Sequence, residues 1–280
     1  MRALGISRSE AYSPNLVEKD ARILHAVGEQ LHLQGAEVSY LSEDELSTSS
    51  LGGVDVVFSM GRHPETLEIL QQAENEGVLV VNPAQGVRNA ERYQLCERLM
   101  ETHPEAFPTT VLLPDIPAHA EGWPYPCWLK RADACAQVKA DVQFIATEQE
   151  AETALQDFKT RGIRKAVVNA HLTGDLVKFY GVAGTDFFFW SYPDIHKTKF
   201  GLEEKNGEAA GYSFDEQQMK AVCDAAALSL SLPVYGGDCV VDPQGNFKII
   251  DFNDWPSFSA CCEAAGKAIA NHIQTRYEHK

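Results

Sequence analysis

The sequence predicts a protein of mixed α/β and α+β class, with a parallel sheet in its first part and an antiparallel sheet in its last. Apolar, strand-like runs alternate with amphipathic helical stretches over roughly the first hundred residues, which favours a parallel sheet covered by helices. A proline-rich stretch follows, and two apolar runs joined by a turn with proline and glycine come near the end. With 280 residues, the chain is long enough for two or three units.

The first unit, residues 1–112, is interpreted as four strands with helices between them. The strands are predicted at 3–6, 38–41, 54–58 and 78–81, with helices from about residue 16, from residue 65, and from about residue 89 to 100. Ligands bind at the carboxyl ends of strands in such sheets. Arg8 and Arg62 follow two of these strands and could hold an anionic substrate, although for either arginine alone a solvated loop is the preferred interpretation.

The second and third units are predicted at residues 113–174 and 175–280, after a linker of residues 103–126 that contains six prolines. The middle unit has predicted strands at 127–130, 142–145 and 165–171, and a helix that begins with a capping box at Thr147 and Glu150. The last unit has a strand at 176–182, an irregular stretch at 191–212, and a helix after a capping box at Ser213 and Glu216. A hairpin of 237–241 and 247–252 and a final helix from about residue 259 complete it.

Composition and charge exclude several classes of partner. The net charge of −16 argues against nucleic acid and against anionic membranes, which need basic surfaces. No apolar stretch approaches the roughly 20 residues that span a bilayer, and the first residues predict a strand rather than a signal peptide. The seven cysteines are expected to be reduced thiols. We therefore expect a cytoplasmic protein with a small-molecule substrate, and the sequence leaves the oligomeric state open, with a homodimer among the options.

Three oxygen-bearing side chains, Asp238, Asp251 and Asn253, form the strongest chemical pattern. Asp251 and Asn253 are two residues apart, so they share one face of a strand. If Pro243 and Gln244 are the central turn residues, residue 238 lies opposite residue 249, and Asp238 is the diagonal neighbour of Asp251. A slip of one residue would undo this convergence. Such oxygens suit Mg²⁺ that bridges nucleotide phosphates. The alternative is a plain solvent-facing hairpin, against which the apolar flanking residues argue.

In this region the sequence resembles the ATP-grasp superfamily. Asp238, Asp251, Asn253 and Pro256 occur in the order of that family's acidic residue, Asp or Glu, Asn and Pro. The resemblance implies the ATP-grasp fold, in which a pre-ATP-grasp domain (1–112) is followed by a central lid (113–174) and a C-terminal subdomain with the metal site (175–280). It also implies ATP and one or two Mg²⁺ ions, or Mn²⁺ in their place, held by Asp238, Asp251 and Asn253.

The same resemblance implies roles for residues of the two ATP-grasp subdomains. Lys130 resembles the lid lysine that contacts the ATP phosphates, and Lys178 matches a basic residue on the next strand. Both are therefore candidate catalytic and nucleotide-binding residues. The segment Asn169, Ala170, His171 and Leu172 looks like the hinge that holds adenine through backbone hydrogen bonds. Glu91 and Arg92 stand where many relatives have an Asp-Lys pair.

Two reactions are compatible with this resemblance. The first is a carboxylate–amine ligase that works through an acyl phosphate, as in RimK-type ligases and glutathione synthetases. The second is a small-molecule kinase similar to inositol phosphate kinases. Asp251, where ligases commonly have Glu, favours the kinase, whereas Cys135, Ala136 and Ala140 depart from its histidine and glycine pattern. A catalytically silent nucleotide-binding protein is the third hypothesis. Residues 191–212 are expected to order on nucleotide binding. Lys197, Lys199 and Lys205 are either contacts of the substrate or γ-phosphate or, equally well, part of a solvated mixed-charge loop.

Overall fold

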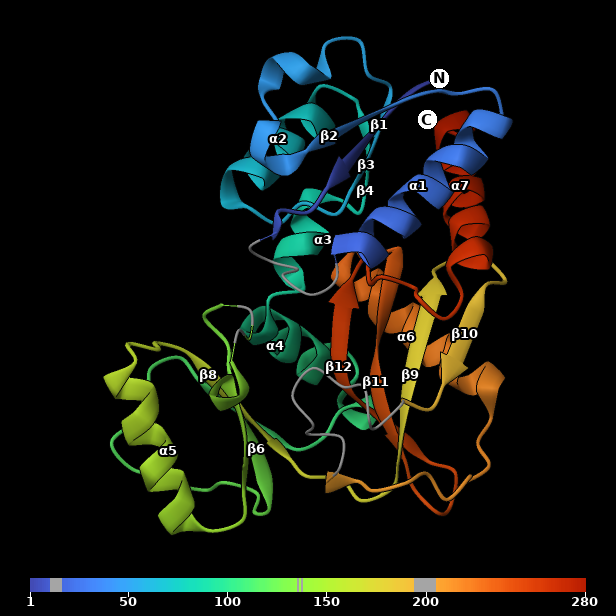
Figure 1. Ribbon diagram of the computed structural model, residues 1–280. Coiled ribbons are helices and arrows are strands. Elements are labelled where there is room, and N and C mark those ends of the chain that lie inside the picture. The colour runs from blue at the N-terminus through green and yellow to red at the C-terminus, as the bar shows by residue number, and fades with distance from the viewer. Residues whose placement is uncertain (11–16, 135, 137, 194–204) are drawn as a thin grey trace.

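A computed structural model of the chain describes residues 1–10, 17–134, 136, 138–193 and 205–280. The described residues form three four-stranded sheets, one parallel and two antiparallel (Figure 1). The predicted class, α/β combined with α+β, is confirmed. None of the helices in the described ranges is both long and apolar enough to cross a membrane.

The N-terminal sheet is parallel, as the alternation of strands and helices predicts. Its strands are β1 (Arg2–Ser7), β2 (Glu37–Ser42), β3 (Val56–Ser59) and β4 (Leu79–Val81), in the order β2-β1-β3-β4. Alternate residues face opposite sides. Ala3 and Phe58 pack with helix α1 (Val17–Leu33), and Leu4 and Val57 pack with helices α2 (Pro64–Asn75) and α3 (Ala84–Asn89). Short 3₁₀ helices, η2 (Glu43–Glu45) and η3 (Thr48–Leu51), lie between β2 and β3.

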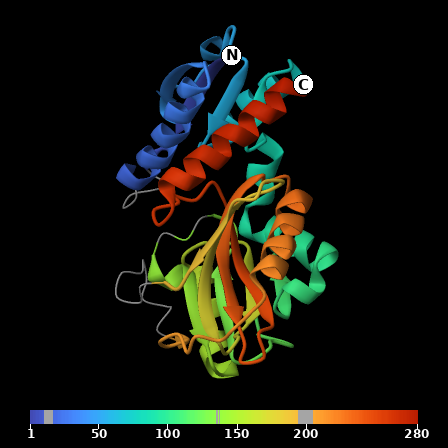
Figure 2. The same ribbon diagram turned by 90° about the vertical axis from the view of Figure 1, so that its right-hand side faces the viewer.

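The C-terminal helix α7 (Cys262–Glu278) packs on this first unit rather than on the sheet that precedes it. Its buried residues Ala265, Ile269 and Ile273 share one core with α1 and the parallel sheet. The two helices approach so closely that a Cβ at Gly266 would lie 2.9 Å from the Cβ of Ala26. The two ends of the chain therefore lie in one layer, as Figures 1 and 2 show.

The middle unit is a small antiparallel sheet covered on one face by a helix, and we call it the lid. Its strands are β5 (Thr110–Leu113), β6 (Cys127–Arg131), β7 (Val142–Ile145) and β8 (Ala166–Ala170), in the order β5-β8-β6-β7. Cys127 and Leu129 pack against helix α5 (Glu148–Thr160), whereas Trp128 and Lys130 alternate with them and face the other side. The expected boundary at 112/113 falls inside β5, and all of β5 belongs to the lid sheet.

The third sheet has the order β10-β9-β11-β12. Its strands are β9 (Asp175–Val182), β10 (Phe188–Ser191), β11 (Val234–Val241) and β12 (Phe247–Asp254). Helices α4 (Arg92–Thr102) and α6 (Glu216–Leu230) cover one face through Leu95, Leu99, Met219 and Cys223. In Figure 2 helix α6 lies on one side of this sheet and the lid strands on the other. The face turned away from α6 is thus available to polar side chains.

Several sequence-based details need correction. The helix expected from about residue 89 to 100 is α4, and a short helix that was not expected, α3, precedes it. The 103–126 stretch contains β5 and the 3₁₀ helix η4 (Pro104–Ala106), so it is not only a linker. The N-cap of α6 is Asp215, whose carboxylate accepts hydrogen bonds from the N–H groups of Gln217 and Gln218, and not Ser213. The predicted cap at Thr147 is confirmed, since its hydroxyl accepts from the N–H of Glu150.

Candidate functional site

A row of charged side chains crosses the open face of the third sheet. In the strand register, Lys178 on β9 lies opposite Asp238 on β11, and Asp238 lies opposite Asp251 on β12. Directly opposed residues of antiparallel strands project to the same face. Tyr180, Gly236 and Asn253 form the next row, two residues along. The three predicted metal ligands therefore share one face.

The register that brings them together differs from the predicted one. The hairpin loop has three residues rather than two, because the N–H of Asp242 donates to the carbonyl of Asn246 at 2.8 Å. Gly245 completes the loop at φ +83°, a conformation that glycine adopts without strain. Cys239 consequently pairs with Ile249, one residue from the predicted register.

A β-bulge then adds a second shift of one residue. Between Cys239 and Asp238 the register slips, so Ile250 is the extra residue on β12 and Asp238 pairs with Asp251. Since side chains alternate with a period of two, two single shifts restore the original face. The carboxylates are thus direct neighbours across the strands rather than diagonal ones.

Lys178 neutralises one of the two carboxylates. Its Nζ lies 2.8 Å from Oδ1 of Asp238, and the two side chains are 31% and 22% exposed. This partial exposure leaves the row accessible to a ligand from the lid side. Ser191 on β10 is the next residue of the row beyond Lys178.

Lys130 reaches the same region from the lid. Its side chain is buried, and Nζ donates to the carbonyl oxygen of Ile250 at 3.0 Å. Ile250 is the extra residue of the bulge, so it has no partner residue on β11. Burial lowers the pKa of Lys130, and the charge of Asp251 acts in the opposite direction. The bulge therefore positions a lysine of the lid beside the carboxylate of Asp251 on β12.

Arg92 is a site residue that was noted in the sequence but not included among the candidates. It is the first residue of α4, and its Nη1 donates to the carbonyl oxygen of Arg131 at 2.7 Å. Its positive charge contributes to the lowered pKa of Lys130. A basic residue immediately after Glu91, matching the family's Asp-Lys pair, was the available signal.

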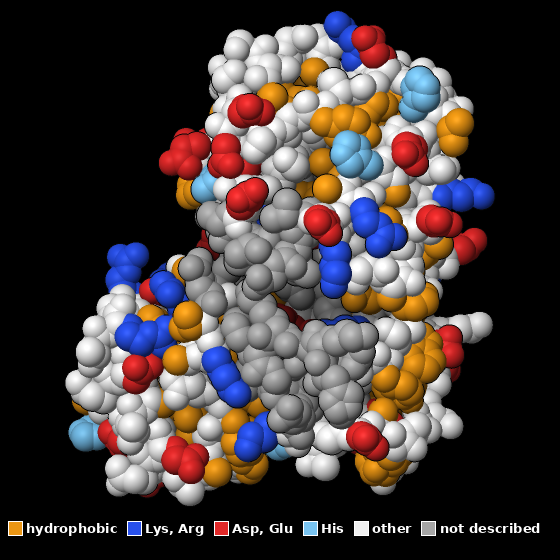
Figure 3. Space-filling view, viewed as in Figure 1, with side chains coloured by type: hydrophobic (Ala, Val, Ile, Leu, Met, Phe, Trp, Pro, Cys, Tyr) orange, Lys and Arg blue, Asp and Glu red, His pale blue; other side chains and the backbone are white. Residues whose placement is uncertain are grey.

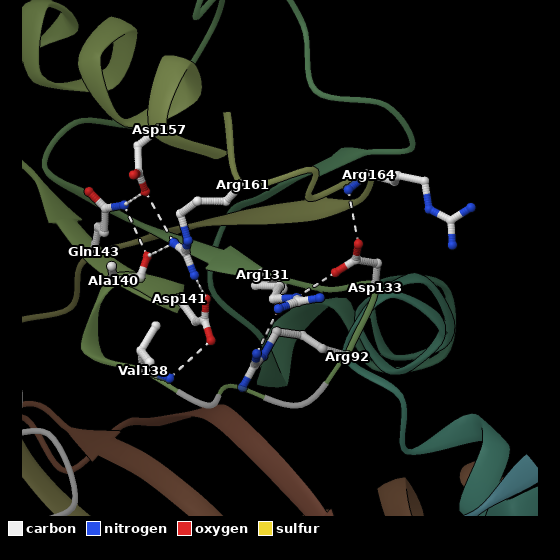
Figure 4. A network of polar contacts seen from close by, with 10 residues as sticks. All are labelled: Arg92, Arg131, Asp133, Val138, Ala140, Asp141, Gln143, Asp157, Arg161 and Arg164. Atoms are coloured by element: carbon white, nitrogen blue, oxygen red, sulfur yellow. Dashed lines mark hydrogen bonds and ion pairs between the residues drawn. The ribbon is translucent and has the colours of Figure 1, made fainter. Parts of the chain in front are cut away.

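The segment that follows β6 is held at both of its ends (Figure 4). At one end, Asp133 accepts hydrogen bonds from Arg131 Nε at 2.6 Å and from the N–H of Arg164 at 2.9 Å. At the other end, buried Asp141 is paired with Arg161. Residues 135 and 137 lie outside the described residues, so the interpretation of Cys135 does too. Lys139 is exposed on the short helix η5 (Lys139–Asp141).

The predicted hinge lies where β8 leads into β9, and several of its polar groups already have partners. The N–H groups of Ala170 and His171 donate to the carbonyls of Thr109 and Pro126 at 2.8 Å. The amide of Asn169 donates to Thr110 Oγ1. The Leu172 carbonyl accepts from the side chain of Asn206 at 3.0 Å. These backbone N–H groups and the Asn169 amide form hydrogen bonds within the lid, and binding of adenine by backbone groups of the segment stays a prediction.

An aromatic surface lines the hinge on the lid face that carries Lys130. The indole N–H of Trp128 donates to Nδ1 of His171 at 3.1 Å, and Phe144 packs edge-on against both rings. Lys205 Nζ lies 4.7 Å from the centre of the Phe144 ring. Burial, and next the charge of Lys205, lowers the pKa of His171. A planar aromatic ligand could stack on such a surface.

The end of the 191–212 stretch is hydrogen-bonded to the start of β9, which follows the hinge. The carboxylate of buried Asp175 accepts from the N–H groups of Ala210, Gly211 and Tyr212 at 2.7–2.8 Å. Lys205 therefore lies next to the hinge, whereas Lys197 and Lys199 lie outside the described residues.

Solved structures resemble the chain along almost its whole length. A RimK domain ATP-grasp protein from Sphaerobacter thermophilus matches with a TM-score of 0.68 at 17% identity, over 97% of this chain and 99% of that one. The D-alanine–D-alanine ligase from Bacillus anthracis matches with a TM-score of 0.68 at 11% identity, over 100% of this chain and 98% of that one. The chain has the ATP-grasp fold. No protein-family model and no curated protein matches the sequence.

The D-alanyl-alanine synthetase A of Vibrio cholerae gives a similar match, with a TM-score of 0.66 at 11% identity over 99% of this chain and 96% of that one. In the ATP-grasp fold of this chain, the charged row of the third sheet faces the lid strand that carries Lys130. The predicted resemblance to this superfamily is thus confirmed at the level of the fold.

Arg8 and Arg62 link the first unit to the end of β12. Arg62 pairs with buried Asp254, which directly follows Asn253. Arg8 donates to the carbonyls of Met60 and Trp255 at 3.1 Å. Both arginines thus fix the approach of the first unit to the end of β12, so the geometry gives them a structural role.

The oxygen donors fit a hard divalent cation. Asp238 and Asp251 are opposed carboxylates, and the Asn253 amide lies two residues along the same face. The described residues contain no cluster of three His, Cys, Asp or Glu side chains that could hold a metal ion. Two carboxylates and one amide suit Mg²⁺, which completes its shell with water and phosphate oxygens, better than Zn²⁺, which prefers nitrogen and sulfur ligands.

On the face seen in Figure 3, basic side chains are mixed with acidic ones and form no continuous basic surface. This distribution agrees with the net charge of −16.

Proposed function

We propose that this chain is an MgATP-dependent carboxylate–amine ligase that acts on small molecules in the cytoplasm. The observation that carries the proposal is the row Lys178–Asp238–Asp251 on the third sheet, with Lys130 reaching it from the lid. This arrangement combines ligands for a divalent cation with two ammonium groups suited to phosphate. The similar structures include a RimK domain ATP-grasp protein and a D-alanine–D-alanine ligase, and their names support the ligase class.

Each side chain has a defined task in this proposal. Asp238, Asp251 and Asn253 hold Mg²⁺, which when bound neutralises charge on the nucleotide phosphates. Lys130 and Lys178 stabilise the negative charge of the transferring phosphoryl group, and Arg92 adds a third cation beside Lys130. The aromatic surface of Trp128 and Phe144 stacks the adenine. No side chain needs to act as a nucleophile.

The proposed ligase reaction has two steps. A substrate carboxylate oxygen attacks the γ-phosphorus of ATP, the bond to the β-phosphate oxygen breaks, and ADP leaves. An amine then attacks the acyl carbon, the bond to the phosphate oxygen breaks, and phosphate leaves while the amine loses a proton to solvent. Catalysis would come mainly from positioning and from electrostatic stabilisation.

A small-molecule kinase is the second candidate, favoured by Asp rather than Glu at position 251. In that reaction a hydroxyl oxygen attacks the γ-phosphorus, its proton goes to solvent, and a phosphoester forms without free phosphate. The metal ligands and lysines would keep the same tasks, so only the products separate the two candidates.

Phosphorus NMR with MgATP and pooled amino acids, small acids and polyols tests the proposal. A ligase releases ADP and phosphate only when an acid and an amine are both present. A new phosphoester signal without free phosphate would overturn the ligase in favour of the kinase. The Asp251→Asn variant in the same pools identifies turnover by contaminating enzymes, which the substitution would leave unchanged.

A further inference from the structure

A cavity lies away from the charged row. It has a volume of about 970 Å³ and contains none of the predicted nucleotide or metal residues. Four parts of the chain form it: the edge strand β4, the turn between β9 and β10, the end of α6 with the turn that follows, and one face of α7. We call it the α7 groove. Its size is in the range of small-molecule sites.

One wall of the groove is basic although the protein as a whole is acidic. The α7 face contributes Lys267, His272 and Arg276, and Asp186 is the one acidic residue among the described residues that line the groove. Lys267 and Arg276 are exposed, and neither takes part in the ion pairs found among the described residues. Lys267 and Arg276 are nine positions apart, about 13.5 Å along the helix axis, so they stand at opposite ends of this wall.

The opposite wall is apolar. It includes Leu79 and Val81 of β4, Leu232 and Pro233 after α6, and Leu228, which is 67% exposed. β4 is an edge strand of its sheet, so no further strand covers this side. An apolar surface next to cations matches a ligand with an apolar body and an anionic group.

A buried polar atom in the same groove lacks a partner. Nε2 of His272 is shielded from solvent and makes no hydrogen bond, although buried polar groups are nearly always paired. Burial, and next the charge of Arg276, lowers the pKa of His272 to about 4. The ring is therefore neutral near pH 7, and the positive charge of this wall comes from Lys267 and Arg276.

We propose that the α7 groove binds a small organic anion, whose apolar body lies on β4, Leu228 and Leu232 and whose anionic group pairs with one of the two cations at the ends of the α7 wall, Lys267 or Arg276. Such a ligand would contact the first unit through β4 and the third through the turn after β9. It would thus bridge two units without entering the charged row. The inference does not depend on the ligase proposal, because no residue is shared between the two sites.

Fluorescence titration with 8-anilinonaphthalene-1-sulfonate, an aromatic anion, tests this site. We expect saturable binding that persists in excess MgATP. The double variant Lys267→Gln/Arg276→Gln should weaken it about five-fold or more, since each exposed charge contributes modestly. Leu228→Glu, which places a negative charge on the apolar wall, should weaken it as well. Lys19→Gln/Arg22→Gln, which removes the same charge from exposed positions of α1, should leave it unchanged.

Three outcomes would overturn the proposal. The first is complete displacement of the probe by MgATP, which would place it at the nucleotide site. The second is equal binding by the groove variants and the α1 control. The third is a dimer, measured by light scattering in the same samples, that Leu228→Glu dissociates, because the groove would then belong to a second copy of the chain. All the changed side chains are exposed, and thermal unfolding of each variant checks that the fold is intact.

Discussion

At the scale of single residues, the charged row brings like charges together and offsets them with cations. Asp238 and Asp251 face each other across two strands, an arrangement that would be destabilising without compensation. Lys178 pairs with Asp238, and Lys130 approaches from the lid close enough for the charge of Asp251 to influence its pKa. The two lysines thus offset the charge of the two carboxylates.

Asp251→Asn should abolish metal-dependent nucleotide chemistry without unfolding the protein. The amide keeps the shape of the side chain but removes one of two carboxylate ligands, so we expect turnover to fall about 100-fold or more, the size of effect seen when an electrostatic stabiliser is lost. Calorimetry should also show weaker ATP binding in Mg²⁺ but little change in EDTA. Asp115→Asn, an exposed change outside the site, serves as the control. Undiminished Mg²⁺-dependent binding in Asp251→Asn would contradict the metal assignment.

Lys130→Met should lower both the stability of the protein and its affinity for nucleotide. Burial lowers the pKa of Lys130, so its charge is costly in the folded protein. Methionine, however, would leave the Ile250 carbonyl without this donor and the carboxylates without this cation, and removing one partner of a buried ionic contact is destabilising. We therefore expect a melting temperature below that of the wild type.

Affinity for ATP should fall about ten-fold or more in the same variant, since a charge-assisted hydrogen bond contributes roughly 1.5–3 kcal/mol. Lys248→Met is the comparison, because Lys248 donates to the Glu105 and Phe107 carbonyls away from the row. Equal affinities in the two variants would show that Lys130 does not reach the phosphates.

At the scale of elements, the β-bulge at Ile250 determines the site. It shifts β12 by one residue and exposes the carbonyl that Lys130 binds. Gly237, opposite Phe252, makes this packing feasible. A Cβ there would collide with the carbonyl oxygen of Asp251 and would lie 2.6 Å from the Phe179 ring.

Gly237→Ala should therefore destabilise the hairpin and disturb the row. We expect a loss of about 1–3 kcal/mol, as for overpacking in a filled core, together with weaker MgATP binding because β12 must move at Asp251. Chemical unfolding and calorimetry measure the two effects. Gly52→Ala is the matched control, since its new methyl group would have the Ser49 carbonyl oxygen, at 3.6 Å, as its nearest neighbour. A variant as stable as this control would mean that the strands adjust freely.

The elements also show what the sequence can predict. The hairpin and the shared face of Asp251 and Asn253 follow from local alternation, and the Thr147 cap follows from a local motif. The bulge depends on how Gly237 packs against a neighbouring strand, and no local pattern encodes that contact. Ser213 and Asp215 are both good N-cap residues, so the choice between them is made by the fold. The partners of Asn169 and of the hinge N–H groups were missed for the same reason, because they come from β5 and the segments beside the lid strands.

At the scale of the whole molecule, contacts between distant parts of the chain fix the sheets relative to each other. Helix α7 returns to the first unit, and Trp255 and Phe258, which follow β12, lie in the same core. This arrangement could not be predicted from the sequence, because the apolar face of α7 does not specify its partner. The first unit and the third sheet are therefore joined through one hydrophobic core into a single body.

Asn82 forms a polar contact between the first unit and the third sheet. It follows β4, is fully buried, accepts from the N–H of Val234 at 2.8 Å, and donates to the carbonyl of Val234 at 2.7 Å. Val234 begins β11, the strand that carries Asp238 four residues later. Asn82→Ala would leave the N–H of Val234 without this partner, whereas the Val234 carbonyl would still accept from the N–H of Trp255 at 3.2 Å. Since an unsatisfied buried group costs about 1–3 kcal/mol, we expect the free energy of unfolding to fall by roughly 1–3 kcal/mol.

Urea unfolding measures this loss, and Asn75→Ala, an exposed change on α2, should stay within about 0.5 kcal/mol of the wild type. If Asn82 also holds β11 in register with the first unit, MgATP binding should weaken in Asn82→Ala even where the protein remains fully folded. A stability loss with unchanged MgATP affinity would mean that β9 and β12 alone keep Asp238 in place. A loss of both would show that the first unit helps to position the metal ligands through Asn82, 156 residues before the ligand in the chain.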